Sequence, residues 1–227
     1  MRILIDIVHP ADVNFYQPAI RRLSAEHEII LTVLKRGKLP ALVKKEFPDH
    51  ELIVIGKHQK SLFLKMVTLA HRSAFFLKLF TQRKIDKVSS FGFYPGLVSR
   101  PLGITSINFH DDKEYTLNFN LTKMSATKFI SFCDIGPSKN TIIGHTFKEL
   151  AYLKEPEFDD SVLEKFGVEK NKFVYVREIA NVSLNYMLRK NFSYQQAFDL
   201  LREKGYQVIF DAEDPNETYE GVIRMNG

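Results

Sequence analysis

The order of apolar and polar positions predicts strands that alternate with helices along the first 150 residues. Short runs rich in β-branched residues recur, and between them apolar residues return at helical spacing. The predicted strands are 3–8, 29–33, 52–55, 86–90, 104–109 and 129–133, and the predicted helices lie at 13–26, 39–47, 61–82, from 95 onward and 115–126. Strict alternation specifies a parallel sheet covered on both faces. The fold class predicted for this part is therefore α/β, a Rossmann-like domain.

The alternation pauses at "KELAYLKEPEFDD", where acidic residues and a proline accumulate, and this predicts a domain junction. We expect an N-terminal domain at 1–150, followed at 151–227 by the junction and a second domain. The second domain shows a strand at 173–176, a helix at 194–204 ended by Gly205, and a strand at 207–210. One strand, helix, strand unit does not bury both faces of a sheet, so we expect a partial second Rossmann-like domain.

Composition predicts a folded, core-forming protein, because 44 % of the 227 residues are hydrophobic. The net charge of +5 is unevenly distributed: residues 1–150 hold 22 Lys and Arg against 13 Asp and Glu, and residues 151–227 hold 10 against 14. The first part is thus basic and favours anionic partners. Charge alone does not choose among nucleic acid, an anionic membrane surface and phosphorylated small molecules.

Several classes are disfavoured. Cys133 is the only cysteine, which excludes an intrachain disulfide or a cysteine-cluster metal site and favours a reducing, cytoplasmic location. Asp6 interrupts the first apolar run, so we expect no signal peptide. No G-x-G-x-x-G follows the first strand, which argues against a nicotinamide dehydrogenase. We expect no cofactor and no metal, and because no recognition motif accompanies the charge, no nucleic-acid partner.

Polar residues follow the predicted strands, where ligands bind in open parallel sheets. In "DIVHPADVNFY", His9 has an imidazole suited to a general base, or it only hydrogen-bonds the loop. Asp12 contacts substrate, or only caps the next helix. In "SSFGFYPGL", Gly92 and Tyr94 are candidate substrate contacts and Pro95 opens a helix whose N–H groups would face an anion; an ordinary turn is the alternative.

A second polar loop, "INFHDDKEY", follows the fifth strand and holds His110, Asp111, Asp112 and Glu114. Mutual repulsion among carboxylates raises a pKa, which is useful for acid or base chemistry, and we select Asp112 and Glu114 as catalytic candidates. Helix capping accounts for at least one of these acids, and nothing in the spacing fixes a metal geometry.

The segment 57–87 contains eight Lys or Arg and one acid, Asp86. On its helix, one face is expected to pack in the core: Leu62, Met66, Leu69, Phe76, Leu77 and Phe80. The opposite face is expected to carry cations with apolar residues among them: Lys60, Lys65, His71, Arg72 and Lys78, with Leu64, Phe75 and Leu79. Peripheral contact of residues 60–82 with anionic lipid is one interpretation, and partial burial against a neighbouring loop is the other.

Four stretches, "ILIDIVHPADVNFY", "IGKHQKSLFLKM", "FHDDKEY" and "GHTFKELAYL" with "KFVYVRE", resemble an uncharacterised family of archaeal and bacterial proteins. That family is glycosyltransferase-B-like (GT-B-like) and distantly related to UDP-N-acetylglucosamine 2-epimerase. The resemblance implies two Rossmann-like domains facing a cleft, a nucleotide-sugar held mainly by the second domain, His9 as base, functional acids at Asp111, Asp112 and Glu114, and Arg177 pairing with a diphosphate. Members usually continue for about a hundred residues more, so the second domain is expected to be shortened.

The leading hypothesis is a glycosyltransferase-like protein of surface polysaccharide or glycolipid biosynthesis. It would transfer a sugar from a UDP-linked nucleotide-sugar to a glycan or lipid acceptor, with His9 deprotonating the acceptor. The alternatives are a sugar-nucleotide epimerase, in which Asp112 or Glu114 moves the proton, and a non-catalytic module docking on membranes or a partner. A location at the inner membrane face and a homo-oligomer stay open.

Overall fold

The computed structural model describes residues 1–57, 62–136, 138–153, 160–178, 194–212 and 218–225, without the side chains of residues 62 and 65. The contacts divide the chain into two compact units, Met1–Pro156 and Glu157–Gly227. Each unit is described by itself.

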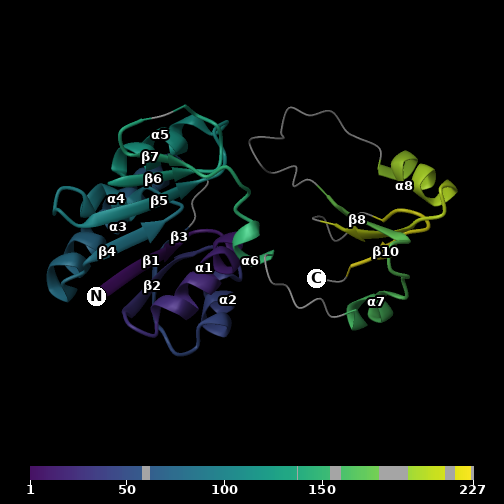
Figure 1. Ribbon diagram of the computed structural model, residues 1–227, viewed down its shortest axis with the longest axis horizontal. Helices are drawn as coiled ribbons and strands as arrows, with labels where there is room; N and C mark the ends of the chain where they lie inside the picture. The colour runs from purple at the N-terminus through teal and green to yellow at the C-terminus, as the bar shows by residue number, and fades with distance from the viewer. Residues whose placement is uncertain (58–61, 137, 154–159, 179–193, 213–217, 226–227) are drawn as a thin grey trace. The chain divides into compact units, whose positions relative to one another are not determined.

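The first unit is built on a seven-stranded parallel sheet with strand order β3-β2-β1-β4-β5-β6-β7 (Figure 1). The strands are β1 Arg2–Ile7, β2 Glu28–Lys35, β3 Glu51–Lys57, β4 Lys87–Ser90, β5 Thr105–His110, β6 Lys128–Ser131 and β7 Thr141–Ile143. The helices are α1 Pro10–Leu23, α2 Leu39–Glu46, α3 Leu62–Arg83, α4 Tyr94–Ser99, α5 Thr116–Ser125 and α6 Leu150–Leu153. The expected α/β Rossmann-like class is confirmed.

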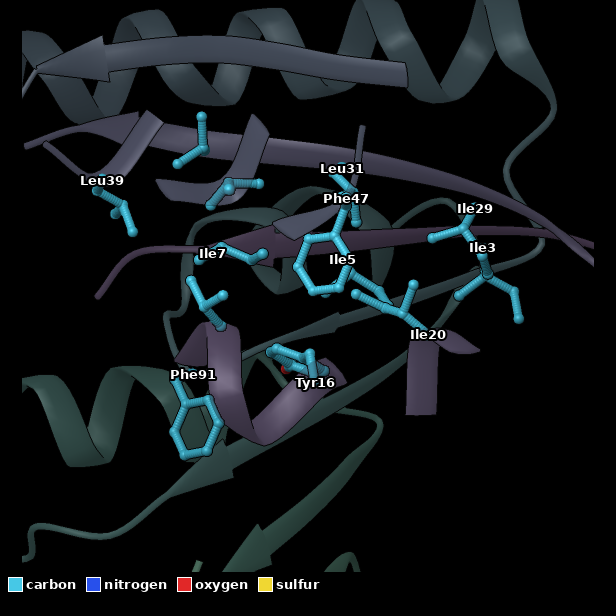
Figure 2. Packing of buried hydrophobic residues seen from close by; sticks show 13 residues of the cluster. Ile3, Ile5, Ile7, Tyr16, Ile20, Ile29, Leu31, Leu39, Phe47 and Phe91 are labelled. Atoms are coloured by element: carbon cyan, nitrogen blue, oxygen red, sulfur yellow. The ribbon is translucent and has the colours of Figure 1, made fainter. Parts of the chain in front are cut away.

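The central strands are buried on both faces, which is why they read as continuous apolar runs. Figure 2 shows the face covered by α1 and α2, where Ile3, Ile5 and Ile7 pack with Tyr16 and Phe91. On the other face Leu4 packs with residues of α3, among them Phe76, Leu79 and Phe80. Successive side chains of β1 thus enter different cores, because a strand alternates its side chains between faces.

The expected inner face of α3 is partly wrong. Phe76 and Phe80 are buried as expected, but Met66 is 58 % exposed, Leu77 is 48 % exposed and Arg72 is fully buried. Arg72 therefore lies on the buried face of α3. Its guanidinium is 2.6 Å from the carboxylate of Asp6, which is also fully buried. The expectation for Leu79, which is 7 % exposed, is wrong for the same reason. Lys60 lies outside the described residues.

Glycine is required where α4 packs on the sheet. A Cβ on Gly96 would lie 2.8 Å from Nδ2 of Asn108 and 3.0 Å from the backbone oxygen of Ser125. The first distance is shorter than real Cβ contacts and the second is tighter than most of them, so a side chain here would push α4 away from β5 and α5.

The second unit holds a three-stranded parallel sheet in the order β10-β9-β8. Its elements are α7 Ser161–Phe166, β8 Phe173–Arg177, α8 Tyr194–Glu203, β9 Gln207–Asp211 and β10 Ile223–Arg224. Phe198 of α8 is fully buried against Val208 and Phe210 of β9. Gly205 ends the helix with φ +84°, the left-handed conformation expected of it. The two-residue strand β10 and the three-residue β7 were not predicted.

Candidate functional site

The strand order of the first sheet reverses between β1 and β4, and such a reversal opens a crevice at the carboxyl ends of the strands. The loop after β1 carries His9 and leads into α1, and the loop after β4 carries Gly92 and leads into α4. The loops after β5 and β7 end at the same edge, because all seven strands are parallel.

His9 and Asp12 cap the amino end of α1. Oδ2 of Asp12 accepts backbone N–H bonds from Val8 at 3.1 Å and His9 at 2.9 Å, and Nδ1 of His9 accepts from Ala11 at 3.2 Å. Asp12 therefore caps α1, which is one of the two roles expected for it. However, burial raises the pKa of this carboxyl to about 7, although the two backbone bonds and the positive charge of Lys148 oppose the shift. A carboxyl that titrates near neutral pH suits proton transfer.

The cap also sets the tautomer of His9. Because the Nδ1 lone pair accepts the Ala11 N–H, a neutral His9 carries its proton on Nε2. In this arrangement Nε2 is a hydrogen-bond donor. A role for His9 as general base therefore requires the ring to leave its cap.

Lys148 and Asp111 complete a charged group around Asp12. The Lys148 ammonium pairs with Oδ2 of Asp111 and lies 5.5 Å from the centre of the Phe91 ring. Burial lowers the pKa of Lys148, but the hydrogen bond and charge of Asp111 and the charge of Asp12 outweigh this and raise it, so the ammonium stays charged. We call Asp12, Asp111 and Lys148 the edge cluster.

Lys148 was missed by reasoning from the sequence, although it lies in the stretch "GHTFKELAYL". The signal that could have found it is its position shortly after β7, a strand too short to be recognised. Once β7 is placed beside β6, Lys148 follows the strand end as His9 and Asp111 do.

His110, Asp112 and Glu114 are held mainly by their own loop. Nδ1 of the buried His110 accepts the Asp112 N–H at 3.1 Å, its Nε2 lies 3.2 Å from the amide nitrogen of Asn118, and burial lowers its pKa. Oδ1 of Asp112 accepts the Glu114 N–H at 3.0 Å, which forms a local turn. Glu114 is exposed. Among these acids it is Asp111 that the structure brings to Asp12.

Tyr94 and Gly92 differ in surroundings. The Tyr94 ring lies 4.5 Å from the guanidinium carbon of Arg72, on the α3 face of the sheet, and burial raises its pKa. The Gly92 N–H donates to Oγ of Ser90 at 2.8 Å. A Cβ on Gly92 would meet its neighbours at 3.5 Å, an ordinary contact, so the backbone conformation does not demand glycine there.

Arg177 belongs to the second unit. Its Nε lies 3.7 Å from the carboxylate of Asp211, which also accepts a bond of 2.7 Å from the Tyr175 hydroxyl. The Arg177 side chain is 65 % exposed, so it is accessible to an anion.

Across the described parts of the chain, no three His, Cys, Asp or Glu side chains gather in a way that would hold a metal ion. Likewise, none of the described helices combines the length and apolar character that a membrane span needs.

Comparison with known proteins shows the fold. No family model and no curated protein matches this chain. Among solved structures, UDP-GlcNAc 2-epimerase from Neisseria meningitidis bound to UDP-GlcNAc matches with a TM-score of 0.69 and 13 % identity, over 100 % of this chain and 72 % of that one. The UDP-GlcNAc 2-epimerase of Methanocaldococcus jannaschii matches at 0.65 and 13 %, over 95 % and 66 %.

The spinosyn forosaminyltransferase SpnP matches at 0.60 and 14 % identity, over 99 % of this chain and 70 % of its own. The fold is therefore GT-B-like, and the similarity to epimerases and glycosyltransferases is a distant one. The chain spans about two thirds of the length of these neighbours.

Proposed function

We propose that this chain acts on a nucleotide-sugar and transfers the sugar from a UDP-linked donor to a hydroxyl of a glycan or lipid acceptor, in surface polysaccharide or glycolipid biosynthesis. The observation that carries the proposal is Asp12, a buried carboxyl with a pKa of about 7 that neighbours Lys148 near the point where the strand order reverses. It offers a base and a fixed cation near the place where such sheets bind nucleotides.

In the proposed step the ionised Asp12 accepts the proton of the acceptor hydroxyl. The acceptor oxygen forms a bond to the anomeric carbon, and the bond from that carbon to the phosphate oxygen breaks. UDP leaves with the electron pair, and the ammonium of Lys148 and the Nε2–H of His9 stabilise its negative charge. This assignment replaces the role of base expected for His9, because its Nδ1 lone pair is used in the helix cap.

The remaining candidates are assigned to binding. Asp112 and Glu114 hydrogen-bond sugar hydroxyls from the loop after β5, and Gly92 and Tyr94 contact the sugar beside the loop after β4. Within the second unit, Arg177 is assigned to a diphosphate, because the planar fork of its guanidinium donates two parallel bonds. The neighbours support a nucleotide-sugar ligand, since one of them is bound to UDP-GlcNAc and another is named a forosaminyltransferase.

Calorimetric titration of the full chain with UDP and UDP-GlcNAc tests the donor part. We expect binding that weakens at least tenfold in Lys148→Met, which keeps the aliphatic stem but removes the charge. Lys45→Met, an exposed lysine of α2, is the matched control and should bind like the wild type. Absence of heat with either ligand, or equal affinity in Lys148→Met, would contradict the proposal.

Epimerisation at a sugar carbon is the second candidate, and the similarity to two UDP-GlcNAc 2-epimerases favours it. Here Asp112 or Glu114 moves the proton of the sugar carbon. Incubation of the chain with UDP-GlcNAc in deuterated water separates the two reactions. Deuterium on a carbon of recovered nucleotide-sugar indicates epimerisation, whereas free UDP formed only when an acceptor is present indicates transfer.

A peripheral membrane contact through α3 is proposed as an accompanying property. The amino-terminal half of this helix exposes large apolar side chains: Phe63 at 74 %, Leu64 at 43 %, Met66 at 58 % and Val67 at 51 %. In the sequence they lie within the basic segment 57–87, and interleaved cations and apolar residues suit anionic lipid. Arg72 no longer counts among the exposed cations.

Flotation with anionic vesicles tests this contact. The double variant Phe63→Ser and Met66→Ser should lose vesicle binding, and Leu117→Ser, an equally exposed apolar residue of α5, should keep it. Equal flotation of both variants, or none for the wild type, would remove the membrane contact and leave the transfer proposal untouched.

A further inference from the structure

An apolar pocket adjoins the edge cluster. Its volume is about 460 Å³, within the range of roughly 300–1,000 Å³ that small-molecule pockets occupy. The lining comes from three places in the first unit: Phe15 of α1, Phe132 after β6, and the segment after β7 with Phe147, Lys148, Leu150 and Ala151.

Two of the rings that line this pocket, Phe15 and Phe132, belong to an aromatic cluster. The Phe15 ring packs edge to face with Phe91 at 4.9 Å, with Phe109 at 4.9 Å and with Phe132 at 6.0 Å between ring centres. The rim is different, since Phe147 is 77 % exposed and Leu150 is 50 % exposed. Large apolar side chains held in water around an apolar hollow suit the binding of an apolar group.

Lys148 joins the pocket to the charged groups. It lines the apolar hollow, while its ammonium pairs with Asp111 and acts on Asp12. Two carboxylates against one ammonium leave a net negative charge when Asp12 is ionised. Beside Asp12 and Asp111, the carboxylate oxygens accept hydrogen bonds from hydroxyls and repel an anionic head, whereas the donor phosphate of the proposed transfer is assigned to Lys148 and His9.

We propose that this pocket binds the alkyl chain of the acceptor, and that the acceptor is a neutral amphiphile of the glycolipid type whose hydroxyl-bearing head lies beside Asp12 and Asp111. This inference deepens the proposed transfer, because the bound amphiphile is an acceptor only if the transfer takes place. The binding site itself is defined by the pocket and can be tested without any donor.

A homologous series of ligands tests the pocket. Hexyl and octyl β-glucoside, kept below the concentrations at which micelles form, are titrated into the full chain with glucose as the headgroup alone. Each buried methylene strengthens binding about fourfold, so octyl glucoside should bind about 15-fold tighter than hexyl glucoside. Equal binding of the two glucosides, or no binding of octyl glucoside, overturns the proposal.

Two variants separate the pocket from adsorption of detergent. Ala151→Phe places a ring in the hollow from an exposed position of α6, and it should weaken octyl glucoside at least tenfold. Leu117→Ser removes an exposed apolar side chain outside the pocket and should leave binding unchanged. Equal weakening in both variants, or in neither, overturns the assignment.

The headgroup is tested with octyl phosphate at pH 8, where it should bind several-fold more weakly than octyl glucoside, and equal or tighter binding overturns the neutral head. The donor proposal fails separately. If UDP-GlcNAc gives no heat while octyl glucoside follows the expected pattern, the pocket stands and the transfer does not. The reverse result removes only the pocket.

Discussion

Asp12→Asn is expected to change how the stability of the first unit depends on pH. Burial holds the pKa of Asp12 at about 7 in the folded chain, against the ordinary value of 3.8 for an aspartate side chain. Between these two values the unfolded chain has lost the proton and the folded chain keeps it. The contribution of Asp12 to the stability of the wild type should therefore fall as pH rises from about 4 to about 7, and become level above.

The magnitude follows from the shift. A difference of 3.2 pH units (7 minus 3.8) corresponds to about 4 kcal/mol, at about 1.4 kcal/mol for each unit. Between pH 5 and pH 8 the loss of stability that Asp12 causes is about 3 kcal/mol, because the loss continues only up to its pKa of about 7. Asparagine does not ionise, and its side-chain oxygen can still accept the N–H bonds of Val8 and His9. Relative to the wild type, Asp12→Asn should therefore gain about 3 kcal/mol between pH 5 and pH 8.

The measurement is urea unfolding at pH 5, 6, 7 and 8, followed by a brief protease pulse that digests only unfolded chains. The amount of undigested first unit is measured, so that unfolding of the second unit does not affect the result. Asp49→Asn, an exposed carboxyl after α2, is the control and should follow the wild type at every pH. Parallel curves for wild type and Asp12→Asn across this range would refute the reasoning about burial.

Three further predictions concern packing, all measured by urea unfolding with the same protease pulse. Arg72→Met should destabilise the first unit by about 3–5 kcal/mol because it leaves the buried Asp6 without its cation, and adding Asp6→Asn should restore more than half of the loss; no restoration would contradict the ion pair. Gly96→Ala should cost about 1–3 kcal/mol, whereas Gly92→Ala should cost less than about 0.5 kcal/mol, because of these two positions it is Gly96 where a Cβ would clash; equal costs would contradict this geometry. Phe198→Ala should cost about 3–5 kcal/mol in the second unit and leave the first unit unchanged, since their cores are separate; matched loss in both units would contradict two cores.

Part of the candidate site could be predicted from the sequence because it depends on local order along the chain. A strand buried on both faces must be an apolar run, and the residues that follow it lie at the carboxyl edge of a parallel sheet. The order of the chain alone therefore predicts that His9, Asp12 and Asp111 lie at one edge. The order of the chain did not show which acids of the loop after β5 would meet Asp12. Asp112 and Glu114 form hydrogen bonds within their own loop.

The amino-acid sequence by itself determined the alternation of strand and helix, and with it the α/β class and the edge where polar loops gather. Only the tertiary structure decided which side chains meet. Arg72 is buried because Asp6, distant in the chain, lies beneath α3, and Lys148 reaches Asp12 because β7 pairs with β6. The physical reason is that periodicity reports which face of an element is apolar, whereas burial of a charge depends on the partner that long-range packing brings to it.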